Sequence, residues 1–522
     1  MKNIVILVDG TWNDGGTDQQ ERSLLTNVVW LRDLCCDNEK QTVWYDEGVG
    51  TDGGLDKLLG GALGLGLTRG ICAAYRAACE RYQPGDRLYF FGFSRGAYTV
   101  RTAADMVAAI GLADLSNVPE TMRDTFCRKL FDVYRGKTEL SKLAAAKFFN
   151  AETAAKAGGT TPIHLVGVWD TVGTAGIPDH YVLLNKLDRV SKRHNWANTE
   201  LSPVVLNGRH AVGMDEQRES FVPALWTNKD GNISNDERIK QLWFCGVHTD
   251  VGGGYEHRDL GNIAMGWMAE EAQDLGLLLK ENPDRPIPKE RAMGVVNDSL
   301  QSVFKHMWTR PRGVPNVHAE ENAALFHPSV LRRYQDPQCP SRPDWRAAKL
   351  DPEETVWRSA WAKDRWSPLG VYCDPEKNYE ISAEGTWYDK DRAYDPAGTW
   401  LNKSKMPLAA ALNMHGIPNW ISKLSGKTKG GGYRRVWGSW RVPDSKPFVL
   451  MGVIADGVGV TRQGEVTLPD PHRQFEIGAG VRIGPGTAVE LQRGGYLYCF
   501  PNDVWSFYKN NRGHITVAIK RT

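Results

Sequence analysis

The chain has 522 residues, more than a single hydrophobic core usually supports, so we expect two domains. Its 64 Lys and Arg residues nearly balance its 62 Asp and Glu residues, and this net charge of +2 argues against a nucleic-acid partner. The nine cysteines are scattered without a C-x-x-C pair, which indicates neither a zinc site nor a disulfide framework. The N-terminal apolar run is too short for a signal peptide, so we expect a protein made in a reducing cytoplasm, whose export would need no cleaved leader.

In the N-terminal two thirds, short apolar runs alternate with glycine-rich turns and helical segments. This pattern predicts an α/β fold with a mostly parallel sheet flanked by helices, in a first domain over residues 1–345. Residues 176–238 interrupt the strand pattern with charged and aromatic side chains, and we expect them to form a cap over a site. The expected strands are Asn3–Val8, Thr42–Glu47, Leu88–Phe93, Ile163–Trp169 and Gln241–Gly246.

Residues 92–96 read G-x-S-x-G between an expected strand and an expected helix. In this setting the motif forms a nucleophile elbow, a tight turn that exposes the hydroxyl of Ser94. Glycine is abundant in the chain and the motif can arise by chance, but the strand–turn–helix context favours a nucleophile. The backbone N–H of Arg95 would then bind the oxyanion, and Gly10 or Thr11, in the loop after the first strand, would supply the second donor. A plain βα turn is the alternative for that loop.

Two more polar side chains follow expected strands, Asp170 after Trp169 and His248 after the run that ends at residue 246. The chain order serine, aspartate, histidine is the order found in α/β-hydrolases. His248 would take the proton of the elbow serine, and Asp170 would fix the imidazole tautomer. Asp250 is an alternative acid, although its nearness to His248 in sequence favours a role in the glycine turn. His164 lies within an expected strand and is more typical of a structural residue. His210 lies in the interrupting segment close to Asp215, Glu216 and Arg218, which indicate a charged helix start and an internal ion-pair cluster rather than a second active site.

Five blocks of this part together resemble an uncharacterised α/β-hydrolase family that includes class 1 type VI secretion lipase effectors. The blocks are DGTWN at 9–13, GDRLYFFGFSRGAYTVR at 85–101, GVWDTVG at 167–173, RHAVGMDEQRESFVP at 209–223 and WFCGVHTDVGGGY at 243–255. The resemblance implies a serine esterase of the phospholipase A kind, with Ser94, Asp170 and His248 at the triad positions. It also implies an antibacterial effector, with secretion machinery and an immunity protein as partners, that leaves the producing cytoplasm for a target cell. Members of the family outside secretion systems carry the same blocks.

The composition changes towards the C-terminus. Residues 346–375 are rich in Trp, Pro and charge, and we expect them to form a linker. Short apolar runs separated by Gly and Pro turns follow, which predicts an all-β sandwich domain over residues 376–522. The expected runs are Tyr379–Thr386, Phe448–Ala455, Gln474–Gly478, Gly495–Phe500 and His514–Lys520.

Three segments of this part resemble the calcium-dependent galactophilic bacterial lectin and related sugar-binding sandwiches. They are EGTWYDKDRAYDPAGTW, PFVLMGVI and GGYLYCFPNDVWSFYKNNRGHITVAIKR. The residues that this resemblance places on calcium ligands are Asp503, Asn510, Asn511 and, through its carbonyl, Phe507. Such oxygen ligands suit a hard cation, and the resemblance implies a glycan partner as well. The sequence departs from the lectin at the fifth ligand, where Tyr388 or Asp389 would serve, and Asn-Asn-Gly is also an ordinary turn.

Two classes of function therefore compete. The first is a two-domain lipolytic enzyme that needs no cofactor for catalysis, with a C-terminal module that binds a glycan or a lipid surface. The second is a carbohydrate-binding surface protein in which the hydrolase part is a non-catalytic scaffold. An esterase acting on a soluble or polymeric ester would share the triad of the first class, and the sequence does not separate these two enzymes.

Overall fold

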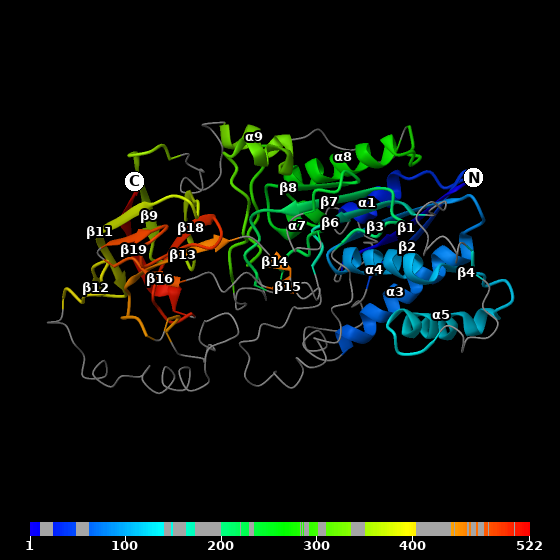
Figure 1. Ribbon diagram of the computed structural model, residues 1–522, viewed down its shortest axis with the longest axis horizontal. Coiled ribbons are helices and arrows are strands. Elements are labelled where there is room, and N and C mark those ends of the chain that lie inside the picture. Colours follow the sequence, from blue (N-terminus) through cyan, green and yellow to red (C-terminus); the bar gives the residue numbers. More distant parts are fainter. Residues whose placement is uncertain are drawn as a thin grey trace.

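The structure is a computed structural model (Figure 1) that describes residues 1–10, 25–48, 62–139, 148–149, 163–172, 200–219, 221–228, 234–281, 283, 286, 292–300, 309–335, 350–402, 440–442, 444–456, 459–460, 466–467, 474–478, 480–505 and 507–522. Six parallel strands in the order β2-β1-β3-β6-β7-β8 form the central sheet. Their bounds are β1 Asn3–Val8, β2 Gln41–Asp46, β3 Arg87–Phe93, β6 Ile163–Trp169, β7 Gly208–Gly213 and β8 Ile239–Phe244. The strand order reverses between β1 and β3, which is where an open α/β sheet binds its ligands, at the carboxyl ends of the strands.

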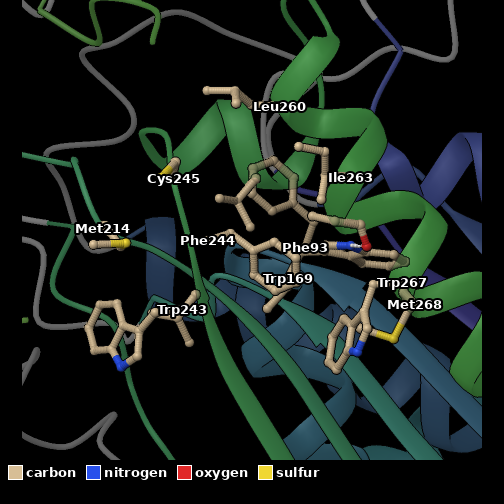
Figure 2. Packing of buried hydrophobic residues seen from close by; sticks show 14 of the residues in the cluster. Phe93, Trp169, Met214, Trp243, Phe244, Cys245, Leu260, Ile263, Trp267 and Met268 are labelled. Carbon is tan, nitrogen blue, oxygen red and sulfur yellow. Dashed lines mark hydrogen bonds between the residues drawn. The ribbon is translucent and has the colours of Figure 1, made fainter. Parts of the chain in front are cut away.

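Helices cover both faces of this sheet (Figure 1). On one face pack α3 Ala62–Arg81, α4 Arg95–Ile110 and α5 Glu120–Tyr134, and on the other pack α1 Asn27–Leu34 and α8 Asp259–Asp274. Figure 2 shows the packing beside α8, where Trp169 of β6 lies close to Trp267 and Met268 of the helix. Both faces of β1, β3 and β6 are thus removed from water, which explains their continuous apolar runs and confirms the expected α/β class. The smaller elements here are β4 Leu112–Ala113, β5 Phe148–Phe149, α7 His248–Gly252, η4 Glu320–Leu325 and α9 Pro328–Gln335.

The expected cap over residues 176–238 is wrong where β7 lies. This strand pairs in parallel with β6 and β8, inside the sheet. Its polar residues argued against a strand in the sequence, but in the fold each of their side chains has a hydrogen-bond partner. Arg209 donates to Glu271 at 2.6 Å, and Nδ1 of His210 lies 2.8 Å from Oε1 of Gln241. Residues 176–199 of the expected cap lie outside the described residues.

The C-terminal part consists mainly of two antiparallel sheets, with strand orders β10-β18-β13-β16 and β12-β11-β19-β9, and β17 also pairs with β11. The bounds are β9 Thr355–Trp361, β10 Ser367–Cys373, β11 Tyr379–Asp389, β12 Arg392–Tyr394, β13 Leu450–Asp456, β14 Gly459–Val460, β15 Val466–Thr467, β16 Gln474–Glu476, β17 Gly480–Ile483, β18 Gly495–Pro501, η8 Tyr508–Asn510 and β19 Asn511–Arg521. Residues of both sheets, among them Trp387, Leu450 and Ile515, share one buried cluster, so the two sheets form the expected sandwich. Residues 355–373, expected within a linker, instead supply β9 and β10, one strand to each sheet.

The sheet that contains β13 is buried on both faces. Along β13, Leu450 and Ile454 belong to the core of the sandwich, whereas Met451 and Val453 belong to the large cluster that also holds Trp243 of β8. The side-chain period of two explains this division, because successive residues of a strand point to opposite faces. The sandwich and the catalytic sheet are therefore joined by a continuous apolar contact.

Candidate active site

The turn expected from the G-x-S-x-G motif joins β3 to α4. Ser94 has φ 58° and ψ −121°, a conformation that a residue with a side chain adopts only under constraint. A Cβ on Gly96 would lie 2.2 Å from the carbonyl oxygen of Val8, and one on Gly92 would lie 2.6 Å from backbone atoms of Gly96. Only glycine fits at these two positions, so the motif is explained by the close approach of β1, β3 and α4.

Ser94, Asp170 and His248 come together at the carboxyl edge of the sheet. Nε2 of His248 lies 2.9 Å from Oγ of Ser94, and Nδ1 lies 2.5 Å from Oδ2 of Asp170. All three side chains are buried, with exposed fractions of 6%, 3% and 0% in the order Ser94, His248, Asp170. Because a carboxylate only accepts, Nδ1 carries the proton and Nε2 is left to accept from the serine hydroxyl. This is the arrangement in which an imidazole acts as general base on a serine.

Asp170 is held by more than the histidine. Its Oδ1 accepts from the backbone N–H of Gly213 at 2.9 Å and from Nη1 of Arg312 at 2.7 Å, and Nη2 of Arg312 donates to Oδ2 at 2.8 Å. Burial raises the pKa of Asp170, but the charge of Arg312 and the hydrogen bonds from His248 and Arg312 outweigh burial and hold this pKa well below its usual range. The carboxylate is therefore ionised. No motif pointed to Arg312, which follows the serine by more than two hundred residues.

The imidazole of His248 lies among aromatic rings. The ring of Phe93 is 4.6 Å away between centroids, and that of Phe221 meets it edge-on at 4.9 Å. Burial lowers the pKa of His248 below its ordinary 6.5, although the hydrogen bond and charge of Asp170 act in the opposite direction. The net shift keeps the imidazole neutral near pH 7, which a general base requires.

Glu216 anchors the backbone of the histidine. It is fully buried, and its Oε2 accepts from the N–H of His248 at 3.2 Å and from Arg218 at 2.8 Å. Its Oε1 accepts from the hydroxyl of Ser299 at 3.0 Å. Burial raises the pKa of Glu216, but Arg218 outweighs burial and lowers this pKa to about 2. The sequence indicated an internal ion pair between Glu216 and Arg218, and the structure adds its contact with His248.

Asp250, the alternative acid, shapes the turn instead. Its carboxylate accepts from the N–H of Val247 at 3.0 Å and from the backbone and side chain of Asn297 at 3.1 and 2.5 Å. Burial raises the pKa of Asp250 to about 6. His164 likewise contacts backbone, with Nε2 2.9 Å from the carbonyl oxygen of Leu275.

The expected oxyanion donors are only partly described. Arg95 is the first residue of α4, where helix geometry leaves the N–H groups without an acceptor inside the helix. The N–H of Gly10 donates to Oδ1 of Asp9 at 2.6 Å, so a donor role for Gly10 would require this bond to open. Thr11 lies outside the described residues.

The five residues expected to bind calcium lie close together in the sandwich. Asp503 accepts from Nδ2 of Asn511 at 2.9 Å, and Asp389 accepts from Nδ2 of Asn510 at 2.5 Å. Asp389 and Asn511 are opposite each other in the pairing of β11 with β19. The carbonyl of Phe507 accepts from the N–H of Asn510 at 3.2 Å. Asp389 at the end of β11 thus meets four residues of the segment 503–511 beside η8.

The chemistry of these residues fits a hard cation. Oδ1 of Asn511 is a buried acceptor without a hydrogen-bond partner, which in a folded protein calls for a ligand or a water. Burial raises the pKa of Asp503 to about 7, and the charge of Asp389 adds to this shift. A cation bound between the two carboxylates would reverse it. Tyr388, the other candidate for the fifth ligand, has the guanidinium of Arg512 over its ring at 4.9 Å.

The parallel sheet, the strained serine turn and the buried hydrogen-bond chain from serine to aspartate are those of α/β-hydrolases. The chain belongs to the family described as T6SS, Phospholipase effector Tle1-like, catalytic domain, whose model matches residues 2–271. Arg312, the whole sandwich and the contact between them lie beyond this match. Within the described parts of the chain, no helix is long and apolar enough to span a bilayer.

Comparisons with individual proteins give weaker likenesses. The uncharacterized protein YEL023C of Saccharomyces cerevisiae is 28% identical over an alignment of 270 residues that covers 48% of this chain and 36% of the yeast protein. The match thus spans about a third of that relative's length. The butyrate-bound esterase Est2 of Thermogutta terrifontis, at 14% identity and a TM-score of 0.27, aligns with 54% of this chain and 86% of its own. The N-terminal domain of EclA, a PllA-like lectin, aligns over 33% of this chain and 99% of its own, at 15% identity and a TM-score of 0.18.

Proposed function

We propose that this protein is a serine ester hydrolase of the phospholipase A type. The observation that carries the proposal is the hydrogen-bond chain from Ser94 through His248 to Asp170, at an elbow where the serine hydroxyl meets a neutral imidazole. Oγ of Ser94 attacks the ester carbonyl while Nε2 of His248 takes its proton. The oxyanion accepts from the N–H of Arg95 and from a second donor, for which Gly10 and Thr11 are the candidates.

The rest of the reaction follows from the same groups. His248 returns its proton to the leaving alcohol, and the acyl group remains on Ser94. Water then attacks the acyl-enzyme with His248 again as base, which releases the fatty acid and restores the serine. Asp170 stabilises the imidazolium in both steps. Membership of a phospholipase effector family supports phospholipids as the substrate, with lysophospholipid and fatty acid as the products.

Two measurements test this proposal. A fluorophosphonate probe should label the wild type and not Ser94→Ala, and a panel of phospholipid vesicles should yield lysophospholipid only with the wild type. Labelling without phospholipid cleavage would favour an esterase on a soluble or polymeric ester. No labelling would contradict the proposal and favour the carbohydrate-binding protein with a non-catalytic scaffold.

We propose in addition that the sandwich binds calcium through Asp503, Asn511, Asp389, Asn510 and the carbonyl of Phe507. The buried acceptor of Asn511 and the raised pKa of Asp503 support this second site. A bound calcium ion would supply open coordination positions to the hydroxyl groups of a glycan, which would hold the enzyme at a glycan-bearing surface. The catalytic groups act without it.

Calorimetry tests the calcium site directly. Calcium chloride titrated into metal-free protein should give one saturable site that Asp503→Asn abolishes. Asp391→Asn is the matched control, because Asp391 pairs only loosely with Arg512, at 3.4 Å on the surface. Equal binding by wild type and Asp503→Asn would overturn the assignment.

The biological setting that we propose is delivery by a type VI secretion machinery into a rival cell. Membership of the effector family supports this setting. The protein would be made in the cytoplasm of the producing cell, and an immunity protein would protect that cell. Expression in a host periplasm should be toxic for the wild type and harmless for Ser94→Ala, and toxicity of both proteins would speak against a lipolytic effector.

A further inference from the structure

Arg312 has no role in the steps proposed above, yet its side chain is buried and held by four hydrogen bonds, unlike that of a typical surface arginine. It is 6% exposed, and both ends of its guanidinium reach the two oxygens of Asp170. The same nitrogens donate to the carbonyl oxygens of Gly213 at 2.5 Å and Phe221 at 2.6 Å. Four hydrogen bonds hold the planar guanidinium of Arg312 in a single orientation. Because two of them go to Asp170, the guanidinium also fixes the plane of this carboxylate.

The segment that carries Arg312, residues 309–317, lies between the catalytic sheet and the sandwich. Val314 and Val317 belong to the apolar cluster that also holds Tyr496 of β18, and the N–H of Val317 lies 3.0 Å from the hydroxyl of Tyr496. At the other end, Nε1 of Trp366 donates to the carbonyl oxygen and the hydroxyl of Thr309, at 2.9 and 3.0 Å. Residues from the C-terminal part thus hold the segment on both sides of the arginine.

We propose that Arg312 is a positioning residue that sets the carboxylate of Asp170 against His248, and that the sandwich keeps Arg312 in place. This inference rests on the proposed serine hydrolase function and deepens it. The carboxylate of Asp170 is not exposed to water, so hydrogen bonds and charges from the protein have to compensate for the cost of burying its negative charge. His248 alone supplies one hydrogen-bond donor. The catalytic unit is then complete only when the C-terminal part is folded against it.

Arg312 also affects the pH at which the site works. Among the described residues, the charged groups that act on the pKa of His248 are Asp170, Glu216 and Arg218, and Arg312 lies behind Asp170. Removing Arg312 takes a positive charge from this group and leaves the carboxylate with a stronger hold on the imidazole proton. The pKa of His248 should then rise, and the acidic limb of kcat/KM should move to higher pH.

The direct test compares Arg312→Met and Arg312→Lys with the wild type, using a short-chain p-nitrophenyl ester from pH 5 to 9. For Arg312→Met we expect kcat to fall on the order of 100-fold, the cost that a misplacement of about 1 Å can carry, with a smaller change in KM. Its acidic limb should shift upward. Arg312→Lys keeps the positive charge but lacks the planar guanidinium that donates to both carboxylate oxygens. The acidic limb of its kcat/KM profile should therefore return towards that of the wild type, while kcat recovers only in part.

A second pair of variants tests the support from the sandwich. Trp366→Phe removes both hydrogen bonds to Thr309 and keeps the aromatic packing, so we expect a loss of kcat and a limb shifted in the same direction as in Arg312→Met. Trp357→Phe is the matched control, because Trp357 is 57% exposed on the edge strand β9 and should behave as the wild type. If Arg312→Met does not fold, Arg312→Lys and Trp366→Phe carry the test.

The outcomes separate this inference from the function on which it rests. If the wild type reacts with the fluorophosphonate at Ser94 but folded Arg312 variants keep both its kcat and its pH limb, the positioning role is refuted and the hydrolase stands. An unaltered Trp366→Phe would refute the support from the sandwich. A wild type that does not react at all would instead remove the hydrolase itself.

Discussion

The substitution Asp170→Asn tests the centre of the proposed site. Four donors converge on the two carboxylate oxygens: Nδ1 of His248, both terminal nitrogens of Arg312, and the N–H of Gly213. An asparagine has one acceptor oxygen, so either orientation of its amide places its NH2 group against two donors. If that group faces His248, the imidazole must flip its tautomer and can no longer accept the serine proton. If it faces Gly213, it meets the N–H of Gly213 and Nη1 of Arg312, donor against donor. In both orientations the neutral amide leaves the charge of Arg312 without its ionic partner.

Both orientations are costly. A wrong tautomer lowers kcat on the order of 10⁴-fold, as in a serine protease with the corresponding change. A buried charge without its partner costs about 3–5 kcal/mol of the free energy of unfolding. We therefore expect Asp170→Asn to lose nearly all hydrolysis of a p-nitrophenyl ester, and to unfold at a clearly lower urea concentration.

Asp250→Asn is the matched control for this experiment. Its carboxylate contacts Val247 and Asn297 and does not reach the imidazole by any hydrogen bond among the described residues. We expect a loss of about 1–3 kcal/mol of stability and less than about a 10-fold change in kcat. A folded Asp170→Asn that kept a tenth of the wild-type kcat, or an Asp250→Asn that lost as much, would refute the assignment of the acid.

Three further predictions follow from the same structure. Because burial lowers the pKa of His248, and the base works only when neutral, kcat/KM should stay level as the pH falls from 8 and decline only below 6.5; a midpoint above 7 would contradict this. Gly96→Ala should abolish activity and cost about 1–3 kcal/mol by denaturant titration, because its Cβ would overlap Val8, whereas Gly70→Ala in α3 has room and should leave kcat unchanged. Calcium affinity measured by calorimetry should rise as the pH passes about 7, where Asp503 loses its proton, and a pH-independent affinity would argue against Asp503 as a ligand.

The sequence by itself predicted the candidate triad and determined the classes of fold. A glycine on each side of Ser94 is required by backbone contacts that any strand–turn–helix of this kind makes, so the elbow could be read from five letters. Asp170 directly follows β6 and His248 lies four residues after the end of β8, and carboxyl ends of parallel strands meet at one edge of a sheet. The short apolar runs and the Gly and Pro turns of the C-terminal part predicted the sandwich, because both are local features of the sequence.

Tertiary structure decided what depends on partners far away in the chain. The charged and polar residues of β7, Arg209 and His210, argue against a strand in the sequence. In the folded protein they are hydrogen-bonded to Glu271 and Gln241, respectively. The strands within the expected linker could not be recognised, because their pairing with β18 and β19 compensates for an irregular pattern. The role of Arg312 could not be predicted for the same reason. It depends on the carboxylate of Asp170, which lies more than a hundred residues earlier in the chain and contacts the arginine only in the folded protein.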